Sequence, residues 1–129
     1  MSDQEGLRGS CLCGAITYET QGPAGAPAAC HCSQCRKASG HVWASSYVDD
    51  DKLTIHGDLR WFQSSDKARR GFCPACGSAL FWKHDDEPFT CFSTGSIDGP
   101  TGLQLRGHIF TADKGDYYTI AASEPQRET

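Results

Sequence analysis

Apolar and polar residues alternate along several short stretches of the chain, as they do in β-strands that bury one face. Ile16 and Tyr18 share a face of one such stretch, and Val42, Ala44 and Val48 share a face of another. We predict eight strands, at residues 15–19, 42–48, 52–56, 59–63, 79–83, 89–94, 103–110 and 117–121. Short strands at this spacing predict a mainly β fold, arranged as a sandwich, a barrel or a coiled sheet.

Local signals between these strands predict one hairpin and one helix. Gly57-Asp58 separates two predicted strands and is typical of a tight β-hairpin. Residues 33–39 predict a helix of a turn or two that follows Cys32, with Ser33 as its capping residue.

The remaining segments predict a single domain. Gly22–Ala29 is a connector of small residues that is too short to separate domains. The polar ends, Met1–Leu7 and Ala122–Thr129, should be frayed or loosely docked. We therefore expect one domain over residues 1–129 with an ordered core at about residues 7–121, because domains most often contain roughly 100–150 residues.

Composition and charge exclude several classes of protein. Twelve basic and sixteen acidic residues leave a net charge of −4, which argues against binding nucleic acid through bulk electrostatics. No stretch approaches the roughly 20 apolar residues that a membrane helix needs. The N-terminus is polar and acidic, unlike a signal peptide. We therefore expect a cytoplasmic protein with no membrane or nucleic-acid partner.

The chain is rich in cysteine, with eight in 129 residues. In an exported protein this number indicates disulfides, whereas in a reducing compartment it indicates metal thiolates, and the absence of an export signal favours metal. Cys91 stands alone in a predicted strand and is interpreted as a small, buried apolar residue. The other seven form three clusters, namely Cys11 with Cys13, Cys30 with Cys32 and Cys35, and Cys73 with Cys76.

The third cluster, Cys73-Pro74-Ala75-Cys76-Gly77, has the form of a zinc knuckle. Pro74 fixes the turn and Gly77 permits a positive φ, so backbone N–H groups can point at the thiolates. The knuckle supplies two of the four ligands of a structural zinc, and Cys11 and Cys13 are the natural partners. A redox dithiol is the alternative, although no βαβ pattern surrounds the motif.

The second cluster places three thiols within six residues, at Cys30, Cys32 and Cys35. Three protein ligands with an open fourth position are typical of a catalytic zinc, where water or substrate binds. The spacing fits a closed structural site equally well, with the fourth ligand from Cys91, His31, His41 or His84. His31, between two of the cysteines, is interpreted as a spacer or as a general acid–base.

Three segments carry a family resemblance: GSCLCGA at residues 9–15, CHCSQCRKASG at 30–40 and RGFCPACGSALF at 70–81. In this order they resemble the glutathione-dependent formaldehyde-activating enzyme family, which is grouped with centromere protein V. The C-terminal residues 108–110 and 114–120 resemble the family's last segment. The family often has a Trp where this chain has Tyr117, a departure that bears on the substrate pocket rather than on the fold.

The resemblance implies an Mss4-like fold of coiled antiparallel β-sheets that binds two zinc ions per chain. It implies a structural zinc and a catalytic zinc with an open fourth position. The structural ion would be held by Cys11, Cys13, Cys73 and Cys76, and the catalytic ion by Cys30, Cys32 and Cys35.

The resemblance also implies carbon–sulfur lyase chemistry, as in S-(hydroxymethyl)glutathione synthase. A small thiol, in the family glutathione, would enter the open zinc position as co-substrate, and its sulfur would add to an aldehyde such as formaldehyde. Arg36 and Lys37 are candidate contacts for the glutathione carboxylates, and Arg69 and Arg70 are further cations. Alternatively, these cations offset the charge of the thiolates or face solvent.

Two other functions stay open. A non-catalytic, zinc-scaffolded protein-binding module would have a closed second site and an exposed apolar patch. A partner of chromatin or the cytoskeleton, by analogy with centromere protein V, is disfavoured by the net charge of −4 and the lack of a basic tail. A small domain with aromatic strands could form a homodimer, and the sequence does not decide the oligomeric state.

Overall fold

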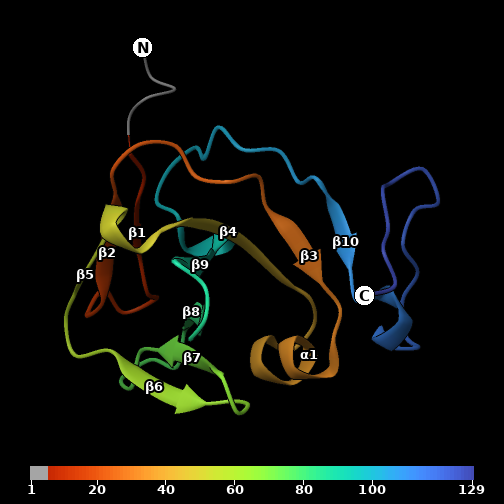
Figure 1. Ribbon diagram of the computed structural model, residues 1–129, viewed down its shortest axis with the longest axis horizontal. Coiled ribbons are helices and arrows are strands. Elements are labelled where there is room, and N and C mark those ends of the chain that lie inside the picture. Colours follow the sequence, from red (N-terminus) through yellow and green to blue (C-terminus); the bar gives the residue numbers. More distant parts are fainter. Residues whose placement is uncertain (1–5) are drawn as a thin grey trace.

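The computed structural model describes residues 6–129 and is built mainly of β-strands (Figure 1). A three-stranded sheet lies at one end, in the order β1 (Arg8–Ser10), β2 (Thr17–Thr20), β5 (Leu53–His56). A seven-stranded sheet has the order β10 (Gly107–Ile109), β3 (Ala28–Cys30), β4 (Trp43–Asp49), β9 (Phe89–Ser93), β8 (Ala79–His84), β7 (Ala68–Phe72), β6 (Arg60–Gln63). Neighbouring strands are antiparallel, except that β10 runs parallel to β3. The predicted mainly β class is confirmed.

Helical structure among the described residues is short. The helix α1 (Ser33–Ser39) has the predicted bounds, and it follows β3 directly. Three single turns of 3₁₀-helix complete the elements: η2 (Asp50–Lys52), η3 (Thr94–Ser96) and η4 (Thr111–Asp113). Within residues 6–129, no helix has the length and hydrophobicity needed to cross a membrane.

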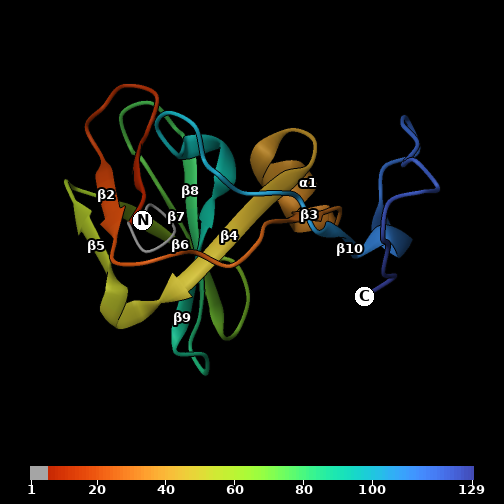
Figure 2. The same ribbon diagram turned by 90° about the horizontal axis from the view of Figure 1, so that it is seen from above.

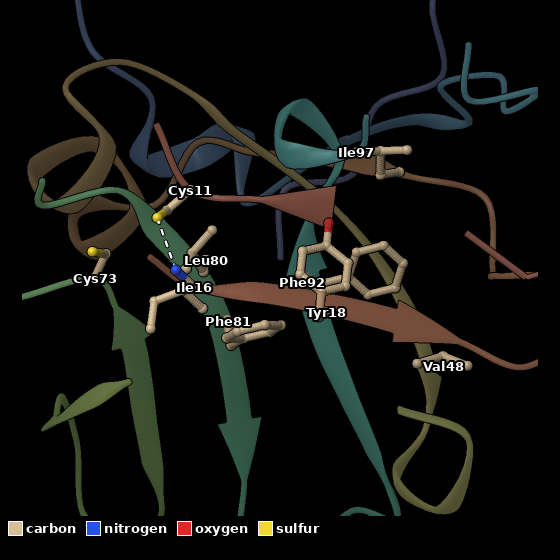
Figure 3. Packing of buried hydrophobic residues seen from close by; sticks show 9 residues of the cluster. All are labelled: Cys11, Ile16, Tyr18, Val48, Cys73, Leu80, Phe81, Phe92 and Ile97. Atoms are coloured by element: carbon tan, nitrogen blue, oxygen red, sulfur yellow. Dashed lines mark hydrogen bonds between the residues drawn. The ribbon is translucent and has the colours of Figure 1, made fainter. Parts of the chain in front are cut away.

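The main core lies where the two sheets pack together (Figure 3). Tyr18 of β2 contacts Phe81 of β8 edge-on, with ring centroids 5.3 Å apart, and Phe92 of β9 at 5.4 Å. The Tyr18 hydroxyl is not left unpaired, because it hydrogen-bonds to Ser96 Oγ at 2.6 Å. Each large side chain buried in this way contributes about 1.5–3 kcal/mol. The core includes Cys11 as well, so it lies directly against the first cysteine cluster.

The predicted hairpin at Gly57-Asp58 is wrong, because its two strands belong to different sheets. β5 pairs with β2, where Ile55 lies opposite Tyr18, whereas β6 pairs with β7. Gly57 adopts φ 108°, and a Cβ there would lie 2.4 Å from the carbonyl oxygen of Ala15. The dipeptide does make a turn, but this turn leads the chain from one sheet to the other. β5 stays with the three-stranded sheet because its apolar side chains pack against the core around Tyr18.

Several predicted strand bounds also need correction. Three strands, β1, β3 and β7, were not predicted from the sequence, and β3 begins inside the predicted connector at Ala28. Of the strand predicted at 103–110, only 107–109 is extended and paired. Residues 117–121 form no strand. There the Lys114 ammonium donates to the Tyr118 carbonyl at 2.6 Å.

The C-terminal segment is docked beside β10 and lies at the opposite end from the three-stranded sheet (Figure 2). His108 N donates to the Pro125 carbonyl, and Arg127 N donates to the His108 carbonyl, each at 2.9 Å. Although residues 122–129 are exposed, their backbone is tied down more firmly than the sequence predicts. Of the frayed N-terminus predicted at Met1–Leu7, residues 1–5 lie outside the described residues.

Candidate metal centres

The first and third cysteine clusters come together at one point. The sulfurs of Cys11, Cys13, Cys73 and Cys76 all lie within 4.8 Å of one another. Cys13 Sγ is 3.7 Å from Cys11 Sγ and 3.8 Å from Cys73 Sγ. Four sulfurs at the usual zinc–sulfur distance of about 2.3 Å form a tetrahedron with edges of about 3.8 Å. The spacing and softness of these donors therefore fit a zinc ion.

Two tight turns aim backbone N–H groups at these sulfurs. Ile16 N donates to Cys11 Sγ at 3.2 Å (Figure 3), and Cys76 N donates to Cys73 Sγ at 3.5 Å. Gly77 adopts φ 81°, as its place in the knuckle predicts, and its N–H donates to the Cys73 carbonyl at 2.8 Å. Such donors stabilise the thiolate form of a cysteine. The hydrogen bond from the Ser78 hydroxyl and the backbone N–H groups lower the pKa of Cys76 to about 5.

The second cluster is assembled between β3 and α1. Cys30 ends β3, Cys35 lies in the first turn of α1, and the sulfurs of Cys30, Cys32 and Cys35 lie within 4.8 Å of one another. Cys32 caps the helix, because its Sγ accepts the N–H of Cys35 at 3.3 Å. The predicted Ser33 cap is therefore wrong. Because the backbone of Cys32 is extended, its sulfur reaches the free N–H of Cys35 at the start of the helix. The capping residue is therefore one position earlier than predicted.

A guanidinium lies beside this second cluster. Arg70 Nη2 is 3.7 Å from Cys35 Sγ. The hydrogen bond with Cys30, and then the charge of Arg70, lower the pKa of Cys35 to about 6. The same shared proton raises the pKa of Cys30. The cluster therefore favours a negative charge at sulfur, which is the state that binds metal.

The three sulfurs face a cavity of about 300 Å³. Among residues 6–129, no further Cys, His, Asp or Glu side chain joins this group within 4.8 Å. Cys91 and His84, two of the predicted fourth ligands, line the cavity without joining the group. Cys91 is half-buried rather than buried as predicted, and desolvation of its thiol raises its pKa to about 11. The rest of the wall is mostly apolar, from Trp43, Ala68, Trp82, Ile109 and Phe110, with polar groups from Gln34, Ser45, Ser65 and Arg70.

The predicted carboxylate contacts lie elsewhere. Arg36 donates through Nη1 to the Asp113 carbonyl at 2.7 Å, and Lys37 is exposed. Neither residue lines the cavity, where Arg70 is the arginine present. The role of Arg36 and Lys37 stays a prediction. In the sequence, Arg70 was one of several cations near the cysteine clusters, and its position three residues before Cys73 did not single it out as the arginine of the cavity.

His31 points away from the sulfurs into a polar chain. Its Nδ1 lies 2.6 Å from Tyr118 Oη, its Nε2 lies 2.8 Å from His108 Nδ1, and His108 Nε2 lies 2.5 Å from Glu124 Oε1. His31 is only 2% exposed, and burial lowers its pKa. Both ring nitrogens are engaged, which favours the spacer interpretation over acid–base chemistry. No sequence pattern linked His31 to Tyr118 or Glu124.

A larger and more open hollow, of about 620 Å³, lies beside the first cluster. Its wall includes hydroxyl groups from Ser10, Ser39, Ser78 and Ser96. Four cysteines already surround the metal position at this cluster, so a ligand in the hollow could not reach a free coordination position. The smaller cavity at the second cluster is therefore the better candidate for chemistry.

Comparisons with known proteins found a family and related sequences. Residues 6–113 match the family model described as "Glutathione-dependent formaldehyde-activating enzyme". A Halomonas elongata protein named "Putative glutathione-dependent formaldehyde-activating enzyme" is 31% identical over 136 residues, which cover 94% of this chain and 85% of that protein. An uncharacterized lyase of Schizosaccharomyces pombe is 26% identical over 115 residues, covering 88% of this chain and 84% of the relative.

A solved structure shares the fold. The crystal structure of a Rhodobacter sphaeroides protein superposes with a TM-score of 0.62 at 22% identity. The match covers 74% of this chain and 92% of that one. At this level of identity the likeness concerns the fold alone.

Proposed function

The chain belongs to the glutathione-dependent formaldehyde-activating enzyme family, and we propose that it is a zinc-dependent carbon–sulfur lyase that handles adducts of glutathione or another small thiol with an aldehyde. Membership and the lyase-named relative support a formaldehyde-activating or lyase-type activity. The observation that carries the finer proposal is the group formed by Cys30, Cys32 and Cys35, which faces a cavity.

The two cysteine groups would have different roles. Cys11, Cys13, Cys73 and Cys76 would hold a structural zinc, whose four positions they would fill. Cys30, Cys32 and Cys35 would hold the catalytic zinc, which when bound would offer its fourth position to a substrate thiol and keep that sulfur deprotonated.

The chemistry is the reversible addition of a thiol to an aldehyde. The substrate sulfur forms a bond to the carbonyl carbon, and the proton of the thiol ends on the former carbonyl oxygen. In the reverse direction the carbon–sulfur bond breaks and the carbonyl is restored. Much of the protein's contribution is to hold both reactants together, because proximity converts a bimolecular step into a local one.

Residues of the cavity wall support this reaction. Trp43, Trp82 and Phe110 give the cavity an apolar wall against which the substrate would pack. Phe110 adopts a left-handed backbone, φ 56°, that side chains rarely take. Arg70 offsets negative charge at Cys35. Hydroxyl and amide groups at Ser45, Ser65 and Gln34 offer hydrogen bonds to the oxygen of the adduct.

The first test is the number of zinc ions per chain, by native mass spectrometry on protein purified with reduced thiols. We expect two ions in the wild type and one in Cys32→Ser. Cys91→Ser is the matched control, because Cys91 lines the same cavity outside the cysteine group, and it should keep both ions.

The second test compares the rate of adduct formation from equal glutathione and formaldehyde with and without protein. The wild type and Cys91→Ser should accelerate the reaction, and Cys32→Ser should not. A single zinc in the wild type that Cys32→Ser leaves in place, with no acceleration, would favour the non-catalytic protein-binding module instead.

A further inference from the structure

Two residues beside the second cysteine group have buried nitrogen donors without a hydrogen-bond partner among residues 6–129. These donors are Trp43 Nε1 and Arg70 Nε, and they are two of the three buried side-chain donors without a partner in this part of the chain, the third being Arg69 Nε on the neighbouring residue. Trp43 is only 8% exposed, so its indole N–H is enclosed by protein. Buried donors are almost always paired in folded proteins, and an unpaired one is costly. Their coincidence at one place suggests that an acceptor from outside the chain belongs there.

The two residues form one unit at the wall of the cavity. The guanidinium carbon of Arg70 lies 5.9 Å from the centre of the Trp43 ring, and both residues line the cavity that the cysteines face. The hydrogen bonds that Arg70 does make are long: Nη2 lies 3.3 Å from Gln34 Oε1 and 3.7 Å from Cys35 Sγ. The guanidinium therefore retains capacity for a stronger acceptor.

At the Arg70 side of the cavity the charge favours an anionic acceptor, whereas the cysteine sulfurs carry negative charge that a bound metal would offset. Its described lining contains no Asp or Glu, and Arg70 takes part in no ion pair among residues 6–129. The neighbouring Arg69, in contrast, pairs with Asp85 at 3.8 Å and lies over Trp61 at 4.5 Å. Successive residues of a strand point to opposite faces, so Arg69 is directed away from this site.

We propose that Arg70, supported by Trp43, is the carboxylate-recognising subsite beside the cysteine group, and that it makes the enzyme selective for thiols with a carboxylate a few bonds from sulfur. A guanidinium matches a carboxylate with two parallel hydrogen bonds. Its contact with Cys35 places this carboxylate within a few ångströms of the substrate sulfur. The inference rests on the proposed function, because it assigns the thiol to the cavity at Cys30, Cys32 and Cys35.

The test compares 3-mercaptopropionate with its methyl ester, which has the same sulfur but no charge. Binding of each to zinc-loaded protein is measured by isothermal titration calorimetry. The wild type should bind the acid about tenfold more tightly than the ester, which is the selectivity expected from one charge-assisted hydrogen-bond pair. Arg70→Met should bring the ratio of the two dissociation constants close to one, and Arg70→Lys should give an intermediate ratio.

Arg69→Met is the matched control, because it removes the adjacent arginine of the same strand, which does not line the cavity. It should keep the wild-type ratio and the wild-type zinc content. Because Arg70 lies beside Cys35, zinc content is measured for every variant and the dissociation constants are compared at equal zinc loading. Equal weakening of acid and ester in Arg70→Met would overturn the inference, since Arg70 would then only offset thiolate charge. Failure of both thiols to bind the wild type would instead overturn the proposed function, and this inference with it.

Discussion

Replacing Cys73 with serine should unfold the protein, whereas the same change at Cys32 should not. Cys73 is fully buried in the main core, and its cluster joins the segment after β1 to the turn between β7 and β8. A metal there would close a loop from Cys11 to Cys76. The second cluster spans only Cys30 to Cys35, next to one short helix.

Loop-closure arithmetic gives the size of this difference. A cross-link that closes a loop of about 65 residues removes roughly 4 kcal/mol of chain entropy from the unfolded state, against roughly 2 kcal/mol for a loop of about six residues. Structural zinc in zinc-finger peptides contributes about 10–16 kcal/mol in total. A domain is stable by only about 5–15 kcal/mol. Loss of the first site should therefore exceed the stability of the fold.

The assay is thermal unfolding followed by far-ultraviolet circular dichroism, with zinc content measured on the same samples. Cys73→Ser should show no cooperative transition. Cys32→Ser should keep one, with a melting temperature lowered by about 10 °C. A Cys73→Ser protein that unfolds cooperatively within a few degrees of the wild type would refute the structural role of the first cluster.

Three further changes test the packing, the electrostatics and the backbone. Phe81→Ala leaves a cavity in the main core and should cost about 3–5 kcal/mol in urea denaturation, and an unchanged midpoint would contradict the packing at Tyr18. Burial by itself would raise the pKa of Asp50, but hydrogen bonds from Lys83 and Thr90 outweigh this effect and hold the pKa below 3.8. The folded pKa is below the unfolded one, so this stability is present above about pH 4 and is lost as the pH falls further. Asp50→Asn should therefore cost about 1 kcal/mol at neutral pH and flatten the stability curve below pH 4; a curve parallel to the wild type would count against the pair. Gly77→Ala should lower the stability of the fold by about 1–2 kcal/mol, because alanine is strained in the left-handed backbone conformation of this residue. The space around an added Cβ is open, so backbone strain is the main effect, and the shift in melting temperature measures it.

Local features of the chain were predictable because neighbours in sequence decide them. One turn of chain brings the sulfurs of Cys30, Cys32 and Cys35 together and starts the helix α1, so both features could be predicted from a short stretch of sequence. The knuckle at 73–77 was predictable for the same reason, since Gly77 supplies the positive φ that the turn requires. The cap at Cys32 was missed because a cysteine side chain is not a usual cap, although its sulfur accepts the N–H of Cys35 at 3.3 Å.

The sequence by itself determined the mainly β class, the helix at 33–39 and the grouping of the cysteines, because these depend on periodicity and on ligand spacing. Only the tertiary structure decided that β5 pairs with β2 rather than with β6. The pairing with β2 is favoured because it packs the apolar side chains of β5 against the core around Tyr18. It also decided which arginine lies beside the second cysteine group. Arg69 and Arg70 are neighbours of equal charge that point to opposite sides of the sheet. Arg69 lies over Trp61, whereas Arg70 lies over Trp43 and beside the sulfur of Cys35.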